Sequence, residues 1–148
     1  MSRLLRLQNR VLNWPARALL ARGLAPPTYA LLETTGRRSG RRRQVPVANG
    51  LQGRTFWLIA GLGDEAQYVK NIRSEPRVRV RARPARLRDG VRMRWYSGTA
   101  HLLPEDDAAA RHRQLGRGRP GYRLDGILLR NLTRLGTGRM LTIRIDLD

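Results

Sequence analysis

The feature that most constrains this fold is the stretch RVRVRARP at residues 77–84, in which arginine and apolar residues alternate strictly. Val78, Val80 and Ala82 fall on one side of an extended chain, and the arginines fall on the other. Successive side chains of a strand point to opposite faces, so the pattern predicts a strand with one buried and one solvated face. A chain built around such a strand needs a sheet whose other face meets water.

Several other segments also have the character of strands. Residues 91–103 repeat the alternation, with Val91, Met93 and Trp95 expected on the inward side, and Asp89-Gly90 suits the turn of an antiparallel hairpin. β-Branched, aromatic and apolar residues predict further strands, with Asn49-Gly50 and Gln52-Gly53 supplying turns. These strands are expected at 28–35, 45–51, 54–61 and 139–147.

Helices are predicted between the strands. One should begin at Asp64, with that carboxylate as its cap, and stop at Glu75, because the residue before Pro76 resists helical geometry. Another should follow Pro104, since three acidic residues favour the positive end of a helix. Amphipathic helical spacing marks two more segments, residues 3–22 and 122–135.

Taken together, these elements predict an α+β fold: a small barrel of mostly antiparallel strands with flanking helices. The chain has 148 residues, a size typical of one domain, so we expect a single domain over 1–148 with an N-terminal amphipathic segment at 3–22.

Charge and composition narrow the function. The formal net charge is +19 and Lys70 is the only lysine, so the chain should attract anions through arginine forks. There is no cysteine and there are only two histidines, which argues against thiol chemistry and against a metal site. No triad, phosphate-binding P-loop or dinucleotide motif is present. If the chain is an enzyme, a bound cofactor should therefore supply the chemistry.

The stretch TTGRRSGRRRQVPV, residues 34–47, is the candidate binding loop. Gly36 and Gly40 can adopt positive φ and turn main-chain N–H groups toward an anion. Ser39 adds a hydroxyl donor, and Arg37, Arg38 and Arg43 can hold phosphate or carboxylate groups in bidentate fashion. Pro46 restricts the chain where it leaves the loop. Such a loop suits a ligand with several anionic groups in a row.

This stretch, followed by a strand ending in IAG and then by QYVKNIRSEPRVRV, resembles the deazaflavin-dependent nitroreductase family over residues 28–103. The resemblance implies a split β-barrel related to flavin mononucleotide (FMN) binders, and it implies coenzyme F420 as cofactor, with FMN as the alternative. It also implies hydride transfer from the reduced deazaflavin to a small organic acceptor. Leu62 stands where the nitroimidazole-reducing branch carries a serine, which argues against that particular activity.

The resemblance also assigns site residues, and the catalytic candidate among them is Tyr68, as a proton donor. The phosphate and the oligoglutamate tail would meet Arg37, Arg38 and Ser39, and Arg43, Gln44, Val45, Pro46, Val47 and Ala48 would continue the cradle along the ring. The deazaflavin head would lie along Ala60, Gly61, Leu62 and Gly63, and the pocket would be closed by Gln67, Tyr68, Lys70 and Asn71.

Several alternatives remain open at this point. The acceptor could be a quinone, an enone or a nitroaromatic compound. The charge and the arginine-faced hairpin would also suit a nucleic-acid-binding module, although few aromatic residues are interleaved with the arginines. A non-catalytic protein that holds F420 or FMN is a third reading. We expect a cytoplasmic protein, with peripheral contact to the inner membrane face through residues 3–22 as a further hypothesis, and a homodimer through exposed sheet edges.

Overall fold

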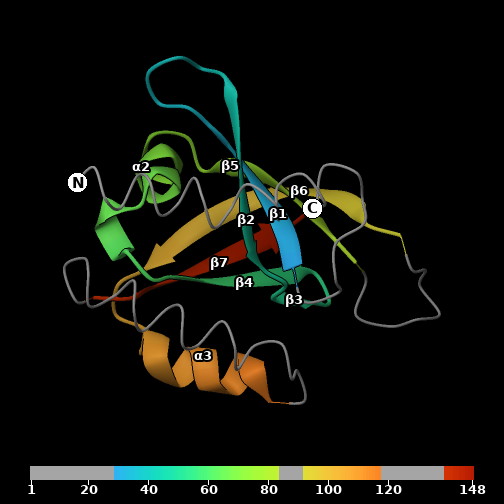
Figure 1. Ribbon diagram of the computed structural model, residues 1–148, viewed down its shortest axis with the longest axis vertical. Helices are drawn as coiled ribbons and strands as arrows, with labels where there is room; N and C mark the ends of the chain where they lie inside the picture. The colour runs from blue at the N-terminus through green and yellow to red at the C-terminus, as the bar shows by residue number, and fades with distance from the viewer. Residues whose placement is uncertain (1–28, 84–91, 118–138) are drawn as a thin grey trace.

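The computed structural model describes residues 29–83, 92–117 and 139–148, which form one curled antiparallel sheet with two helices (Figure 1). The seven strands have the order β2-β1-β5-β6-β7-β4-β3. The predicted α+β split barrel is confirmed. The strands are β1 (Tyr29–Thr35), β2 (Arg42–Ala48), β3 (Leu51–Gln52), β4 (Thr55–Ala60), β5 (Arg77–Ala82), β6 (Arg94–Leu103) and β7 (Leu141–Leu147), and the helices are α2 (Gln67–Ser74) and α3 (Ala108–Gly116).

The alternating strand β5 behaves as its sequence predicts. Val78, Val80 and Ala82 are buried, and β5 pairs antiparallel with β6. The prediction that Trp95 of β6 points inward is wrong: its side chain is 37% exposed and lies among the arginines. Register explains the error, because Trp95 pairs with Arg81, whereas the neighbouring Tyr96 pairs with Val80 and packs against the core.

The sheet has two faces with different partners. The inner face carries the main core, which includes Phe56, Ile143 and Ile145 and is covered by Val69 and Ile72 of α2. On the outer face, α3 covers a smaller apolar cluster around Ile59. The remainder of the outer face carries the polar side chains of β1, β5 and β6. The inner face of the sheet is therefore apolar, and this part of the outer face is polar and rich in arginine.

Several element boundaries differ from the prediction. The strand predicted at 45–51 is divided: β2 ends at Ala48, and Leu51 begins the short β3. Strand β2 begins at Arg42, inside the arginine run, because Arg42 to Ala48 pair residue by residue with β1. The helix predicted from Asp64 starts as a short 3-10 turn, Gly63–Glu65, and α2 follows after Ala66. Asp64 does not cap α2; its carboxylate pairs with Arg73 instead. The predicted stop at Glu75 is confirmed.

The other predictions divide into two groups. The last strand and the helix after Pro104 are confirmed, and the Asp107 carboxylate caps α3 by accepting from Ala110 N at 3.1 Å. The helical segments at 3–22 and 122–135 and the Asp89-Gly90 turn lie outside the described residues. Among the described residues, no helix is long and apolar enough to cross a membrane.

Candidate functional site

The arginine-rich turn between β1 and β2, residues 36–41, is held closed by its own backbone. Gly36 N donates to Arg41 O at 2.7 Å, and Gly40 N donates to Gly36 O at 2.8 Å. Gly40 has a φ of 68°, which only glycine adopts without strain. The Ser39 hydroxyl oxygen accepts from Arg41 N at 3.2 Å, so this side chain braces the turn while its own O–H remains able to donate.

Gly36 does not have the positive φ that we expected from the sequence. The space around Gly36 favours glycine instead. A Cβ atom here would lie 3.0 Å from Ser39 Oγ and 3.1 Å from Arg41 O, so the turn would have to shift by a few tenths of an ångström to admit a side chain.

Arg37 ties this turn to helix α2. Its main-chain N and its Nη1 donate to the Asn71 side-chain oxygen at 3.2 and 3.1 Å, and its Nη2 donates to Gln67 Oε1 at 2.9 Å. Asn71 is 4% exposed, and its amide nitrogen also donates to Thr34 Oγ1 at 3.2 Å. Three predicted site residues therefore meet, but they bind one another, so Arg37 and Asn71 position the turn.

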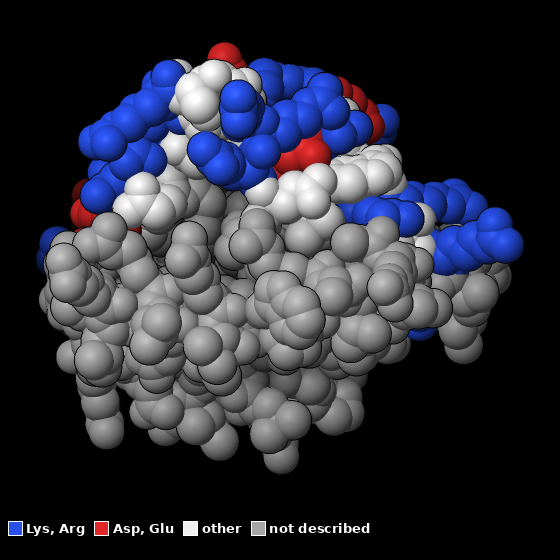
Figure 2. All heavy atoms as spheres, turned by 45° about the horizontal axis from the view of Figure 1, so that its top comes forward, with Lys and Arg blue, Asp and Glu red and all other residues white. Residues whose placement is uncertain are grey.

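Two further arginines of the turn, and Arg43 at the start of β2, have no side-chain partner among the described residues. Arg38, Arg41 and Arg43 are exposed and make no side-chain hydrogen bond or ion pair with any described residue. Figure 2 shows arginine side chains gathered over the face at the top of Figure 1, where this turn and α2 lie. A multiply charged anion at the turn would thus find guanidinium groups that are not already neutralised.

Strand alternation divides the predicted cradle residues of β2 between the two faces. Val45 and Val47 pack into the inner core, and Arg43 shares their phase. Gln44, Pro46 and Ala48 have the opposite phase: Gln44 donates to Glu33 on the outer face, and Ala48 packs with the α3 cluster. One flat ligand ring cannot contact both sets.

The residues predicted for the ring form part of the inner core. Ala60, Leu62, Val45 and Val47 belong to one apolar cluster, and Tyr68 packs against it. Gly61 and Gly63 are buried at the start of the 3-10 turn, where Gly63 has a φ of 54°. Burial raises the pKa of the Tyr68 phenol above its usual value. Lys70 is half-buried on α2.

A buried carboxylate lies on the outer face, in the third β1–β2 residue pair from the turn. Glu33 is 5% exposed, and its oxygens accept from Arg79 Nε at 2.8 Å and from Gln44 Nε2 at 2.9 Å. Arg42 approaches it to 3.7 Å. Burial raises the pKa of Glu33, but the hydrogen bonds and the arginine charges outweigh that effect, and the pKa lies below its usual value.

The family model for F420H(2)-dependent quinone reductase matches residues 17–148, which include the turn, both helices and every strand described above. The chain belongs to this family. It is therefore an F420-dependent oxidoreductase, with coenzyme F420 as its cofactor. This assignment favours the reductase over the nucleic-acid-binding module. None of the curated proteins matches the chain in sequence.

Solved structures support the fold of this family member. An F420-H2 dependent reductase (FDR-A) superposes with a TM-score of 0.52 at 19% identity, covering 80% of this chain and 93% of that one. A second F420 reductase gives a TM-score of 0.56 at 18% identity, covering 86% and 91%. The heme storage protein HutZ from Vibrio cholerae gives 0.56 at 13% identity, covering 90% and 89%. At these identities the likeness concerns the fold alone.

The described residues suit a polyanionic coenzyme. Guanidinium groups with no partner in the described part of the chain surround the turn, and Gly40 leaves room there for close approach. On the outer face, Arg81 Nε is shielded from solvent and has no hydrogen-bond partner among the described residues.

Sequence reasoning missed three contributors. Arg41 is the middle arginine of the exposed run, and its place in the same motif could have marked it. Thr34 and Glu33 carry no local signal, because their importance comes from Asn71 and Arg79, which lie far along the chain.

Proposed function

We propose that the chain transfers a hydride from reduced F420 to a quinone-type acceptor and that the arginine turn holds the anionic groups of the coenzyme. The observation that carries this proposal is the clamp of Arg37 onto Asn71 and Gln67, which holds a turn whose Arg38 and Arg41 side chains have no partner among the described residues. The quinone follows from the description of the matching family.

The proposed roles follow from placement. Arg38, Arg41 and Arg43 bind phosphate and carboxylate groups, and Ser39 donates through its free O–H. The apolar wall beside the ring comes from the side chains that face the inner core, namely Val45, Val47, Ala60 and Leu62. Gln67 and Lys70, at the exposed start of α2, close the pocket. Gln44, Pro46 and Ala48 point to the opposite, outer face of β2 and do not contact the ring.

The chemistry needs little from the protein beyond orientation. Reduced deazaflavin, when bound, supplies the hydride. A quinone takes up that hydride and one proton to become a quinol, so neither a protein nucleophile nor a metal is required. We propose that Tyr68, which packs against the apolar cluster beside the ring, supplies the proton from its phenolic oxygen.

Fluorescence titration and turnover test this function. Reduced F420 should bind at one saturable site and reduce a short-chain quinone faster than an enone or a nitroaromatic compound at equal concentration. Arg38→Ala should weaken coenzyme binding about tenfold, the usual loss for one charged contact. If FMN binds more tightly than F420, or if no acceptor is reduced, the proposal is wrong.

We also propose that the protein acts as a homodimer. A similar structure, described as a domain-swapped dimer, superposes with a TM-score of 0.54 at 17% identity, covering 89% of this chain and 94% of that one. Sheets of this kind leave edge strands, here β2 and β3, that a second copy can cover. Analytical ultracentrifugation should give twice the mass of 16.9 kDa; a single species at the monomer mass would refute the dimer.

A further inference from the structure

An exposed aromatic ring is held in place on the outer face of the sheet. Among the residues that the structure describes, Trp95 is the one large hydrophobic side chain that is exposed. The centre of its ring lies 4.5 Å from the guanidinium carbon of Arg79 and 5.8 Å from that of Arg81. A cation over an aromatic ring attracts it, so these contacts fix the indole against β5. A side chain that is already fixed loses little conformational entropy when a ligand binds to it.

The Arg79 side chain beside this ring is itself anchored. Its Nε donates to Glu33 at 2.8 Å, and Glu33, which is 5% exposed, also accepts from Gln44 Nε2 at 2.9 Å. The terminal Nη groups of Arg79 make no hydrogen bond with any described residue, so their donors remain available. The buried carboxylate thus positions both the guanidinium group and the ring that it contacts.

A small depression of about 160 Å³ adjoins the ring, because Arg79 and Ser97 line it and Ser97 lies two residues beyond Trp95 on β6. Its other end is lined by Thr35 of β1 and Arg42 of β2. A water molecule takes up about 30 Å³ of the liquid, so the depression has room for a phosphate group. The hydroxyls of Ser97 and Thr35 can donate to such a group.

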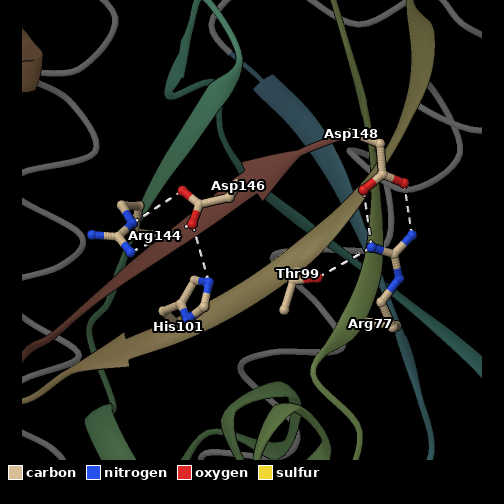
Figure 3. Close-up of polar contacts among 6 residues, drawn as sticks. All are labelled: Arg77, Thr99, His101, Arg144, Asp146 and Asp148. Atoms are coloured by element: carbon tan, nitrogen blue, oxygen red, sulfur yellow. Dashed lines mark hydrogen bonds and ion pairs between the residues drawn. The ribbon is translucent and has the colours of Figure 1, made fainter.

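The depression carries net positive charge. Three arginines line it, namely Arg42, Arg77 and Arg79. Glu33 pairs with Arg79 and is approached by Arg42 at 3.7 Å, while Arg77 donates to both carboxylate oxygens of Asp148 (Figure 3). Three guanidinium groups therefore face two carboxylates, and Arg42, which is 70% exposed, keeps most of its N–H donors for a ligand.

The ring and the depression are spaced as the two parts of a nucleotide are. Trp95 and Ser97 are two residues apart on one face of a strand, which is about 7 Å. A sugar of similar length separates a nucleotide base from its phosphate. We propose that the outer face binds single-stranded nucleic acid, with a base stacked on Trp95 and a phosphate in the depression between Ser97 and Arg42. This is a second binding function, on the face of the sheet opposite the apolar wall proposed for the coenzyme ring.

The chemistry of this face favours a nucleic acid over a lipid surface. A surface that enters a bilayer buries several apolar side chains, whereas the described part of this face exposes one large hydrophobic side chain, Trp95. A single strand is favoured over a duplex, because its unstacked bases can reach an aromatic ring. The formal net charge of +19 attracts any such polyanion from a distance.

Fluorescence anisotropy with a labelled oligothymidylate of about twelve nucleotides tests this proposal. Trp95→Ala should weaken binding about tenfold, the loss expected for one stacked base, and Trp95→Phe should stay within about threefold of wild type. Arg42→Gln should weaken binding about fivefold and make the slope of log Kd against log salt shallower by about 0.7, the value for one phosphate of a single strand. Trp95→Ala should leave that slope unchanged, and its affinity for reduced F420 should change less than about twofold.

Arg144→Gln is the matched control for Arg42→Gln. It removes the same charge from the same face, but Arg144 already donates to Asp146, which His101 Nε2 also approaches at 3.1 Å (Figure 3). Its affinity for the oligonucleotide should therefore change less than about twofold. Circular dichroism melting of each variant verifies that the fold is retained.

Four results would overturn the proposal. Equal losses in Arg144→Gln, Arg42→Gln and Trp95→Ala would mean that only the overall charge acts. Equal affinity for a duplex of the same length would exclude stacking on Trp95. Equal competition by thymidine monophosphate, at the same nucleotide concentration, would assign the site to a free nucleotide. Sedimentation with phosphatidylserine vesicles that depends on Trp95, without oligonucleotide binding that does, would assign the face to a lipid surface. Coenzyme affinity measured on the same variants keeps each of these results separate from the proposed reductase function.

Discussion

At the scale of single residues, the buried polar groups decide how the turn is held. Glu33 and Asn71 are among the few buried polar side chains of the described residues, and each one is hydrogen-bonded to an arginine. A buried polar group that loses its partner destabilises the fold by more than a satisfied one contributes. Substitutions of Glu33 and Asn71 should therefore destabilise the fold, although nothing in the sequence pattern marks these two positions.

Glu33→Gln should lower the free energy of unfolding at neutral pH by about 1–2 kcal/mol, because Arg79 and Arg42 lose a charged acceptor. The pKa of Glu33 in the folded protein lies below its usual value of 4.5, so its stabilisation is present above that pH and is lost as the pH falls through the lower folded value. Urea unfolding of both proteins should therefore show a difference that shrinks in acid. Glu105→Gln, at an exposed site, is the control and should change nothing.

Asn71→Ala should destabilise the protein by about 2 kcal/mol, because it leaves the Thr34 hydroxyl and both donors of Arg37 without their hydrogen-bond partner. It should also weaken coenzyme binding, because the turn loses its anchor. The salt dependence separates this role from direct contact: the slope of log Kd against log salt should stay at the wild-type value in Asn71→Ala and become shallower in Arg38→Ala. A slope reduced equally in both variants would contradict the positioning role of Asn71.

Tyr68→Phe should keep the packing of α2 while removing the proposed proton. If the phenol supplies that proton, quinone turnover should fall at least about tenfold, with coenzyme Kd changed by less than about twofold. Stopped-flow oxidation of the bound reduced coenzyme, measured beside equilibrium titration, would separate the two effects. Unchanged turnover would assign Tyr68 to packing alone.

At the scale of elements, the turn and α2 act as one unit. The turn supplies exposed charge, whereas α2 supplies a buried apolar face and the two amides that bind Arg37. The rigidity of the turn therefore comes from a helix about thirty residues later in the chain. Changes in the backbone of the turn should alter the affinity for the coenzyme.

Gly40→Ala and Gly53→Ala form a matched pair at this scale. Both glycines have positive φ, 68° and 60°, and neither has an atom within 4 Å of the position of a Cβ. Each substitution should therefore destabilise the fold by a similar amount, about 1–2 kcal/mol, from backbone strain alone. Only Gly40→Ala should weaken coenzyme binding, as measured by fluorescence titration. Equal binding losses in the two variants would show that the turn has no special part.

At the scale of the whole molecule, the order of the strands places the end of the chain in the middle of the sheet. Strand β7 lies between β4 and β6 and carries the fully buried Ile143. Two parts of the sheet, β2-β1-β5-β6 and β4-β3, are therefore joined through the last strand. Non-local pairing of this kind makes folding depend on the complete chain.

Removal of residues 141–148 should abolish cooperative unfolding, because it exposes the inner core and separates the two parts of the sheet. Urea titration followed by circular dichroism should then show no sharp transition. Removal of Asp148 alone takes away its exposed ion pair with Arg77 and one main-chain hydrogen bond to Ser97 O, and it is the control; the transition should survive there. A cooperative transition in the shorter chain would contradict the central role of β7.

The local properties of this protein follow from its amino-acid sequence. The alternation at 77–84 specified which side chains of β5 are buried, the residue before Pro76 ended α2, and the motif at 34–47 pointed to the coenzyme through its resemblance. These signals depend on neighbours along the chain. Tertiary structure decided the phase of Trp95, the start of β2 within the arginine run, and the use of Arg37 as a clamp. Each of these depends on a partner distant in sequence, and strand register and a buried amide exist only once the sheet has formed.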